Sequence, residues 1–214
     1  MIFPIGDTQV KGGTFPYFSY AFLIVNVVMF VWQTIAPGRL ICEGAVIPQH
    51  IANHHHLYTL ITSQFLHAGL LHLLGNIIIL WIFADNVEAS VGNIRFLIFY
   101  LIGGIAATFA HIYFGTNFEI DGECCIPCNA SFISCKKDFP TCEAFTPTLG
   151  ASGALSAVIG AYIVMFPKSK IKILVLFLFR NIFIPAWVFL ILWFSVQLYS
   201  GYISLTSTSI ESMK

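Results

Sequence analysis

Apolar residues are concentrated along the chain in long runs, and polar loops separate these runs. A helix needs roughly 20 mostly apolar residues to cross the hydrocarbon core of a bilayer. Several runs are shorter than this, which a membrane helix tolerates when neighbours pack around it and the bilayer thins locally. The pattern predicts five membrane helices, at Tyr17–Gln33, Leu70–Ala84, Phe96–Phe114, Ser152–Phe166 and Pro185–Tyr199. The predicted fold class is therefore an all-α polytopic membrane protein.

Two further stretches lie outside these helices. Residues 1–16 are polar and rich in Gly and Pro, and they lack the basic stub and cleavage site of a secretory signal peptide, so the first helix should be retained. The stretch Lys172–Ile184 is apolar but contains Arg180 and Asn181. We interpret it as interfacial or as a lead-in to the fifth helix.

Composition supports a membrane protein. The chain is 57% hydrophobic and 9% charged, with a mean hydropathy of +0.84, whereas soluble domains carry about a quarter charged residues. Ten basic and ten acidic residues leave no net charge to attract nucleic acid. The partners expected are the lipid bilayer and not nucleic acid. The length suits one membrane domain, residues 17–201, with a polar tail at 202–214.

Short loops that are rich in Lys and Arg lie on the cytoplasmic side of a membrane. The basic residues in such loops therefore indicate how the chain is oriented in the membrane. Five alternating helices place five of these residues on one side: Lys11, Arg95, Lys168, Lys170 and Lys172. We therefore expect the N-terminus to be cytoplasmic. The loops 34–69 and 115–151 and the tail then lie outside, and the plasma membrane is the expected location.

All cysteines fall in the two predicted outer loops: Cys42 in the first, and Cys124, Cys125, Cys128, Cys135 and Cys142 in the second. An even number on an oxidising face favours disulfides, which would staple a loop too small to have its own core. A zinc site built on CCIPC with Cys135 and Cys142 is the alternative. Free thiols are a third reading, and the pairing is not readable from the sequence.

The segment HAGLLHLLGN, from His67 to Asn76, leads into the second helix. His72 and Asn76 are four residues apart, so they lie on one helix face, one turn apart. Polar side chains in an apolar span usually face the bundle interior or a wet cavity and are functional candidates. The alternative is that they hydrogen-bond a neighbouring helix and have no chemical role.

The segment TLGASGALSAVIGAY begins the fourth helix. Ser152 lies near the helix N-terminus, where free amides can stabilise developing negative charge. Gly150 and Gly153 leave its hydroxyl unshielded. The alternative is a packing motif with an N-capping serine, because Gly153 and Ala157 belong to a series of small residues that lets a partner helix approach.

Together the two segments resemble the rhomboid family of intramembrane serine proteases. The resemblance runs from FPIGD through LYTLITSQFLHAGLLHLLGN to IRFLIFYLIGGIAA, and it resumes with GASGALSAVIGAY and PAWVFLILWFSVQLYSG. The cysteine-bearing insert, about 116–146, is unlike the family. The resemblance implies a rhomboid-like helical bundle in which five of six core membrane helices are present.

The resemblance also implies residue roles. Ser152 is expected to be the nucleophile, with His72, Asn76 and the Ser152 amide stabilising the oxyanion and Gly150 shaping the approach. His67 is expected to be structural. No metal or cofactor is implied. The family base is a histidine in the sixth helix, within an A-H-x-x-G pattern that this chain does not contain.

A serine hydroxyl is a weak nucleophile without a base. Lys168 is ~24 Å along the same helix, which is too far, and His72 belongs by motif to the oxyanion site. His111, late in the third helix, and the insert lysines Lys136 and Lys137 are weaker substitutes. The run from His54 to His56 suggests a metal site, but consecutive side chains diverge, and a solvated loop is the alternative reading.

We expect an intramembrane serine endopeptidase that cleaves transmembrane proteins through an acyl-enzyme, and we expect the chain as it stands to be inactive. One alternative is an inert pseudoprotease that binds transmembrane clients. Another is a disulfide-stapled receptor or assembly factor of the outer face. The sequence does not indicate the oligomeric state.

Overall fold

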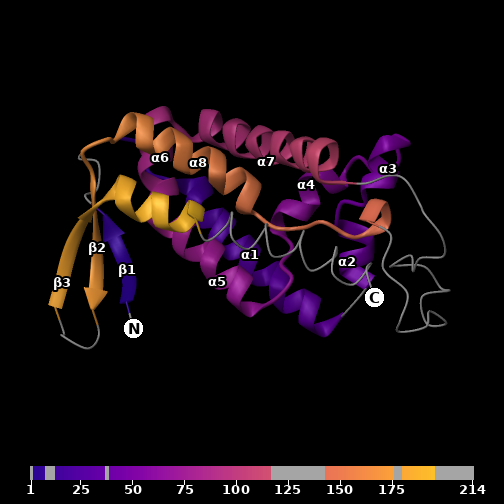
Figure 1. The fold of residues 1–214 in the computed structure, drawn as a ribbon, viewed down its shortest axis with the longest axis horizontal. Coiled ribbons are helices and arrows are strands. Elements are labelled where there is room, and N and C mark those ends of the chain that lie inside the picture. The colour runs from indigo at the N-terminus through magenta and orange to yellow at the C-terminus, as the bar shows by residue number, and fades with distance from the viewer. Residues whose placement is uncertain (1, 8–12, 37–38, 117–142, 176–179, 196–214) are drawn as a thin grey trace, which may run out of the picture. The chain divides into compact units, whose positions relative to one another are not determined.

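The computed structural model describes residues 2–7, 13–36, 39–116, 143–175 and 180–195. These residues are mostly helical, as predicted (Figure 1). In chain order the elements are β1 (Ile2–Asp7), α1 (Tyr17–Ile35), α2 (Arg39–Gly44), α3 (Pro48–Ala52), α4 (Thr59–Thr62), η1 (Ser63–Phe65), α5 (Leu70–Ile79), η2 (Leu80–Ala84), α6 (Asp85–Val91), α7 (Asn93–Gly115), η4 (Glu143–Phe145), α8 (Ser152–Met165), β2 (Lys170–Val175), β3 (Arg180–Pro185) and a last helix, Ala186–Ser195. The chain forms two compact units, one of residues 10–160 and one of residues 1–9 with 161–214.

Within the described residues, three helices are long and apolar enough to cross a membrane: Tyr17–Ile35, Leu70–Val91 and Asn93–Phe114. The second is a continuous run of α5, the π-helical turn η2 and α6. Two shorter apolar helices, Ser152–Met165 and Ala186–Ser195, correspond to the fourth and fifth predicted helices. A helix is thus found at each of the five predicted positions, although residues 196–199 of the fifth prediction lie outside the described residues. The chain is an integral, helical membrane protein.

The second helix extends beyond its predicted end at Ala84 and ends at Val91. The added part contains a buried polar residue, which the apolar pattern did not include. Glu88 in α6 is fully buried. Its carboxylate accepts hydrogen bonds from the backbone amides of Phe18 (2.9 Å) and Ser19 (2.7 Å) and from the Ser19 hydroxyl (2.7 Å). These amides lie in the first turn of α1, where they have no partner within the helix. Glu88 therefore caps α1 from another helix.

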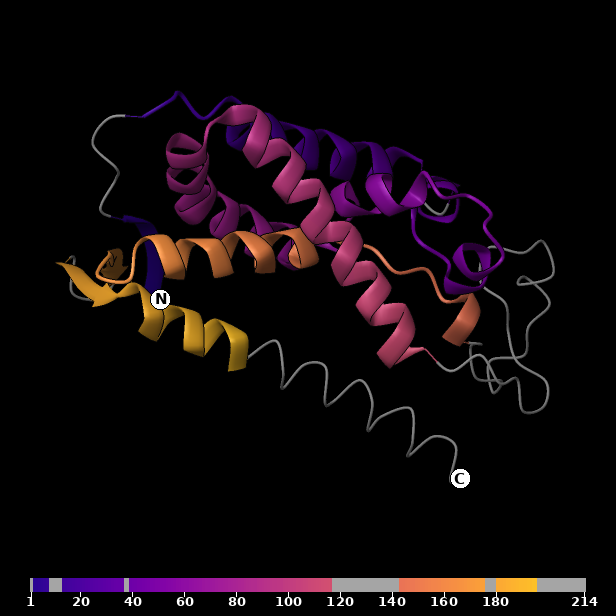
Figure 2. The same ribbon diagram turned by 90° about the horizontal axis from the view of Figure 1, so that it is seen from above.

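Small residues set the contact between α7 and α8 (Figure 2). A Cβ atom added at Gly103 would lie 2.6 Å from the Cβ of Ala157, and one added at Gly153 would lie 2.6 Å from the Cβ of Ala107. Both distances are far below van der Waals contact. The prediction that Gly153 and Ala157 allow a partner helix to approach is confirmed, and the partner is α7.

The second unit contains a three-stranded antiparallel sheet in the order β1-β2-β3 (Figure 1). This sheet differs from the expectation from the sequence, which is a polar segment at residues 1–16 and an interfacial stretch or a lead-in to a helix at Lys172–Ile184. Lysine and isoleucine alternate from Lys170 to Ile173, which is a strand pattern. Ile171 is fully buried, whereas Lys170 is exposed. The segment therefore forms a strand, which its alternation indicates, and not the interfacial stretch or helix that its general apolarity suggested.

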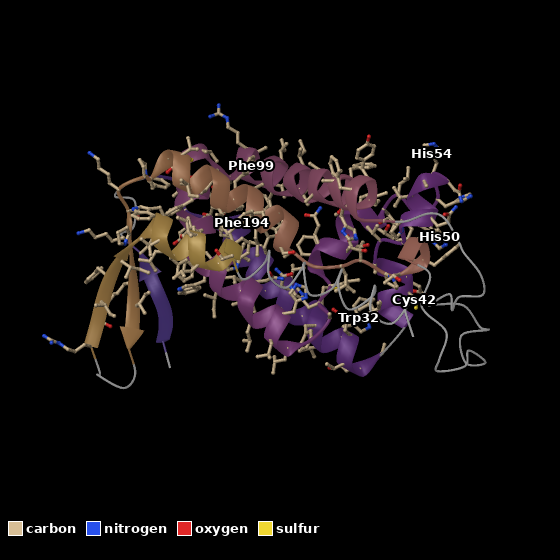
Figure 3. All side chains as sticks on the ribbon, in the orientation of Figure 1. Trp32, Cys42, His50, His54, Phe99 and Phe194 are labelled. Carbon is tan, nitrogen blue, oxygen red and sulfur yellow. The ribbon has the colours of Figure 1, made fainter. Side chains whose placement is uncertain are left out.

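Cys42, labelled in Figure 3, lies in α2 and forms a disulfide bond. The expectation of disulfides in the outer loops is thus supported at this cysteine. Every other cysteine lies between positions 124 and 142, outside the described residues. The pairing, the zinc alternative and most of the 116–146 insert, like the 202–214 tail, also lie outside them.

Candidate active site

Ser152 is the first residue of α8, and its side chain is half-buried. Its carbonyl accepts the hydroxyl of Ser156 one turn later (2.8 Å). No residue in the described part of the chain forms a hydrogen bond with the Ser152 hydroxyl. Because Ser152 begins α8, its hydroxyl lies at a helix N-terminus, where backbone amides have no acceptors within the helix.

The ring of His72 lies directly against Gly150. A Cβ atom at residue 150 would lie 2.7 Å from His72 Cε1 and 3.0 Å from His72 Nε2. Gly150 also has φ +129°, a conformation that side chains disfavour. Its amide donates to the carbonyl of Ser63 (2.9 Å), which fixes the loop before Ser152. The structure thus brings His72 of α5 against the segment that carries Ser152.

Asn76 lies on α5 one turn after His72 and is only 5% exposed. Its Nδ2 amide is buried, and no described residue accepts a hydrogen bond from it. Buried amide groups are normally hydrogen-bonded, so an unpaired donor calls for an explanation. A donor held ready for a negatively charged oxygen would explain it.

His67 precedes α5, and Gln33 of α1 holds it in place. The His67 amide donates to Gln33 Oε1 (3.0 Å), and Gln33 Nε2 donates to the His67 carbonyl (2.9 Å). The His67 ring packs edge-on against the His72 ring, with centroids 5.2 Å apart. Burial, and to a lesser degree the nearby His72, lowers the pKa of His67 to about 4. The His67 ring is thus neutral near pH 7 and packs against one side of the His72 ring.

Gln64 supports the same region and was not identified from the sequence. It is 2% exposed, and its Nε2 donates to the carbonyls of Leu60 (2.9 Å) and Leu101 (3.3 Å). A side chain at Gly104 of α7 would overlap the Gln64 amide. Gln33 and Gln64 were missed because their partners lie in distant segments of the chain and neither belongs to a spacing pattern.

Two of the substitute bases, His111 and Lys168, lie in the described residues, and neither forms a hydrogen bond with the Ser152 hydroxyl there. His111 is exposed, and its Nε2 lies 3.3 Å from the hydroxyl of Thr148. Thr148 is itself tied to Val46 by two backbone hydrogen bonds, of 2.7 and 2.9 Å. Lys168 is exposed and follows the end of α8. Lys136 and Lys137 lie outside the described residues.

The histidines of the loop after α3 are exposed. His50, labelled in Figure 3, stacks on His56 with centroids 5.1 Å apart, and His56 Nδ1 lies 3.1 Å from the hydroxyl of Tyr58. His54 and His56 have positive φ values. Within the described ranges, no cluster of three or more His, Cys, Asp or Glu side chains could hold a metal ion.

The arrangement suits stabilisation of an oxyanion next to a hydroxyl nucleophile. His72 and Asn76 lie on one helix and provide side-chain donors, while the start of α8 provides backbone amides. Donors fixed in advance around a developing negative charge are usually the largest single contribution to catalysis of acyl transfer. The catalytic roles of these residues remain a prediction.

Comparison with known proteins gives a consistent result. The family model described as Rhomboid domain matches residues 54–212. The chain is 25% identical over 151 residues to presenilin-associated rhomboid-like protein A, mitochondrial, of Danio rerio (71% of this chain, 33% of the relative). It is 34% identical over 104 residues to rhomboid protease GluP of Bacillus subtilis (46% and 20%). It is 26% identical over 159 residues to rhomboid protein 1, mitochondrial, of Saccharomyces cerevisiae (73% and 38%). The matched regions thus cover between a fifth and two fifths of these relatives.

Proposed function

The chain belongs to the rhomboid family, and on this premise we propose that it is an intramembrane serine endopeptidase that cleaves transmembrane proteins, with Ser152 as the nucleophile. The contact between His72 and Gly150 carries the proposal, because it brings a side-chain donor against the loop that ends at the serine. One relative is named a rhomboid protease, which adds family-level support.

In the proposed reaction, the Ser152 oxygen attacks a substrate carbonyl and the carbonyl oxygen becomes negatively charged. His72, the unpaired Nδ2 of Asn76 and the Ser152 amide donate to that oxygen. A base takes the Ser152 proton and gives it to the nitrogen of the leaving group, so the peptide bond breaks to an acyl-enzyme and a free amine. Water then hydrolyses the acyl-enzyme to the acid and the free serine. The Ser152 proton needs an acceptor, and no described side chain bonds this hydroxyl. The family base is a histidine in an A-H-x-x-G pattern that these 214 residues do not contain, so we propose that the chain as it stands is inactive.

The membrane in which this occurs is a separate question. We expected the plasma membrane from the sequence, but two of the relatives above are named as mitochondrial and give that location no support. The proposal is therefore limited to an integral membrane enzyme with its site within the helical bundle. The cytoplasmic N-terminus remains a prediction.

A second candidate is a pseudoprotease that binds transmembrane clients without cleaving them. It is favoured by one observation: no base contacts the Ser152 hydroxyl within the described ranges. Some relatives are named rhomboid-like rather than protease, which is compatible with either reading.

The two candidates are separated with a fluorophosphonate probe, which reacts covalently with activated serines. The labelling is done in membranes on the chain extended by a rhomboid sixth helix, because the A-H-x-x-G pattern that carries the family base is not among these 214 residues. The endopeptidase predicts an adduct that Ser152→Ala abolishes. Ser156→Ala is the matched control, because Ser156 is an exposed serine on the same helix, and it should leave the adduct unchanged. Absence of an adduct, together with client capture that Ser152→Ala does not affect, would establish the pseudoprotease instead.

A further inference from the structure

Four exposed aromatic side chains gather where α1 begins. Phe15, Tyr17, Tyr20 and Trp81 are each between 36% and 64% exposed. The centroid of the Phe15 ring lies 4.8 Å from that of Tyr17 and 5.6 Å from that of Tyr20. The Tyr20 ring in turn packs edge-on against the Trp81 ring, with centroids 6.3 Å apart. We call these four residues the aromatic cluster.

The aromatic cluster joins two elements that are distant in the sequence. Three of its rings lie at the start of α1, and the fourth, Trp81, lies in the π-helical turn η2 of the second helix. The Thr14 amide donates to the carbonyl of Ala89 in α6 (3.2 Å), which ties the segment before α1 to the second helix. Glu88 of α6 accepts from the first-turn amides of α1. These bonds hold together the two elements that carry the rings.

The polar tips of the aromatic cluster have no protein partner in the described part of the chain. No residue there forms a hydrogen bond with the hydroxyl of Tyr17 or Tyr20, or with the indole N–H of Trp81. Tyrosine and tryptophan combine an apolar ring with one polar group, and they are enriched where a bilayer meets water. The tips can therefore hydrogen-bond to lipid headgroups.

On one side, the aromatic cluster continues into the lipid-facing surface of α1. Ile24, Val28 and Val31 are exposed, and they follow Tyr20 at intervals of three or four residues, so they lie on the same helix face. The helix is long and apolar enough to cross a membrane. Exposed apolar side chains on such a helix face the acyl chains of the lipid.

On the other side, the chain becomes polar. The mostly apolar run of the second helix ends at Ala84, three residues after Trp81, and α6 then begins with Asp85 and carries the exposed Ser90. The exposed Thr14 precedes the cluster at the start of α1. The aromatic cluster thus lies where both elements change from apolar to polar, which is the change expected at the end of the hydrocarbon layer.

We propose that the aromatic cluster is the surface through which this end of the helix bundle binds the headgroup and glycerol layer of the phospholipid bilayer. The rings pack against the acyl chains next to the glycerol, and the hydroxyl and indole groups donate to phosphate and ester oxygens. The boundary of the hydrocarbon then crosses the second helix at Trp81, and α6 lies outside it although the helix is continuous. This binding does not depend on the protease activity, because it involves none of the residues around Ser152.

The test measures the depth of single tryptophans in the full chain, reconstituted in phosphatidylcholine vesicles. Trp32→Phe, Trp187→Phe and Trp193→Phe together leave Trp81 as the only tryptophan. Its fluorescence should be quenched about twofold more by lipid brominated next to the glycerol than by lipid brominated near the end of the acyl chain.

Two matched variants of this protein carry Trp81→Phe and a tryptophan elsewhere. With Val28→Trp, about 12 Å further along α1 than Tyr20, the deep bromine should quench more strongly than the shallow one. With Ser90→Trp, on α6, aqueous iodide should quench and neither brominated lipid should. Quenching of Ser90→Trp by the deep bromine would overturn the proposed boundary.

Three results at Trp81 would overturn the proposal. A depth equal to that of Val28→Trp would put the aromatic cluster in the hydrocarbon, and quenching by iodide alone would put it in water. Protection from bromine and iodide together would show that protein covers it. Circular dichroism of each variant checks that folded proteins are compared.

The natural chain provides a measurement without substitutions. Phosphatidylcholine that carries a photoactivated carbene precursor next to the glycerol should label the aromatic cluster, and mass spectrometry of peptides should locate the adduct at Tyr17, Tyr20 or Trp81. Labelling of Val28 in place of these residues, or no label on the cluster, would contradict the proposal.

Discussion

The His72 ring occupies the space that a side chain at Gly150 would need, with His72 Cε1 only 2.7 Å from the position of a Cβ atom. A histidine from one helix and a glycine from the loop before another are thus fitted to each other. The absence of a side chain at residue 150 is therefore a requirement of the site and not only of the backbone.

In the chain extended by a rhomboid sixth helix, Gly150→Ala should strongly reduce labelling of Ser152 by fluorophosphonate. The added methyl group would displace His72, and the positive φ would cost about 1–2 kcal/mol. We expect a fall in labelling rate of at least about tenfold, because the displaced ring is one of the donors to the oxyanion. Gly75→Ala is the control, since a Cβ atom at Gly75 in α5 would meet nothing within 4 Å. Equal labelling in the two variants would contradict the prediction.

In the same extended chain, Asn76→Ala should lower the labelling rate without lowering stability. Removing one oxyanion donor typically costs about 10²–10³ in rate. The Nδ2 group has no described partner to leave unpaired, so the thermal unfolding midpoint should stay the same or rise. Gln33→Ala provides the contrast, because it removes two buried hydrogen bonds to His67 and should lower the midpoint. A large loss of stability in Asn76→Ala would argue for a purely structural asparagine.

Glu88→Ala should destabilise the protein by about 3–5 kcal/mol, because it leaves the buried amides of Phe18 and Ser19 and the Ser19 hydroxyl without an acceptor. The measurement is thermal or denaturant unfolding in detergent. Ser90→Ala, on the same helix, removes only a bond from an exposed side chain to the Asn86 carbonyl and should change stability by less than about 0.5 kcal/mol. Similar effects of both variants would rule out the cap as a main anchor of α1.

Stability should fall as the pH is lowered from 6.5 towards 4. The pKa of His67 is lowered from 6.5 to about 4, first by burial and then by His72. Its neutral form is favoured in the folded state, so its contribution is complete above the unfolded value and is lost as the pH approaches the folded one. The unfolding midpoint of His67→Gln should therefore vary less over this range. His54→Gln, at an exposed histidine, should keep the full dependence.

The sequence was sufficient to predict what depends on local pattern. The apolar runs gave the five helices, and the motifs around His72 and Ser152 identified two segments that the structure brings into contact at Gly150. The spacing of Gly153 and Ala157 predicted a close helix contact, which is formed with α7. Helix patterns are local, so these features could be predicted without a structure.

Features that depend on distant residues could not be predicted in this way. Nothing near Glu88 in the sequence indicates that it caps a helix some 70 residues earlier. The two hydrogen bonds between Gln33 and His67 are another example, because nothing in the sequence around Gln33 indicates that it holds a residue of a later segment. The alternation from Lys170 to Ile173 was available as a signal, but a strand also needs a partner, and β1 lies at the other end of the chain.

The pairing of β1 with β2 also bears on the order of folding. Ile2 pairs with Val175, so the first strand waits for nearly all of the described chain before it can form its sheet. At about 5–20 residues per second, that wait lasts roughly 10–30 s during synthesis. Each helix has local contacts and can form as it enters the membrane, whereas pairing of remote segments is slow. The pairing of β1 with β2 should therefore form later than the helices that lie between these two strands in the chain.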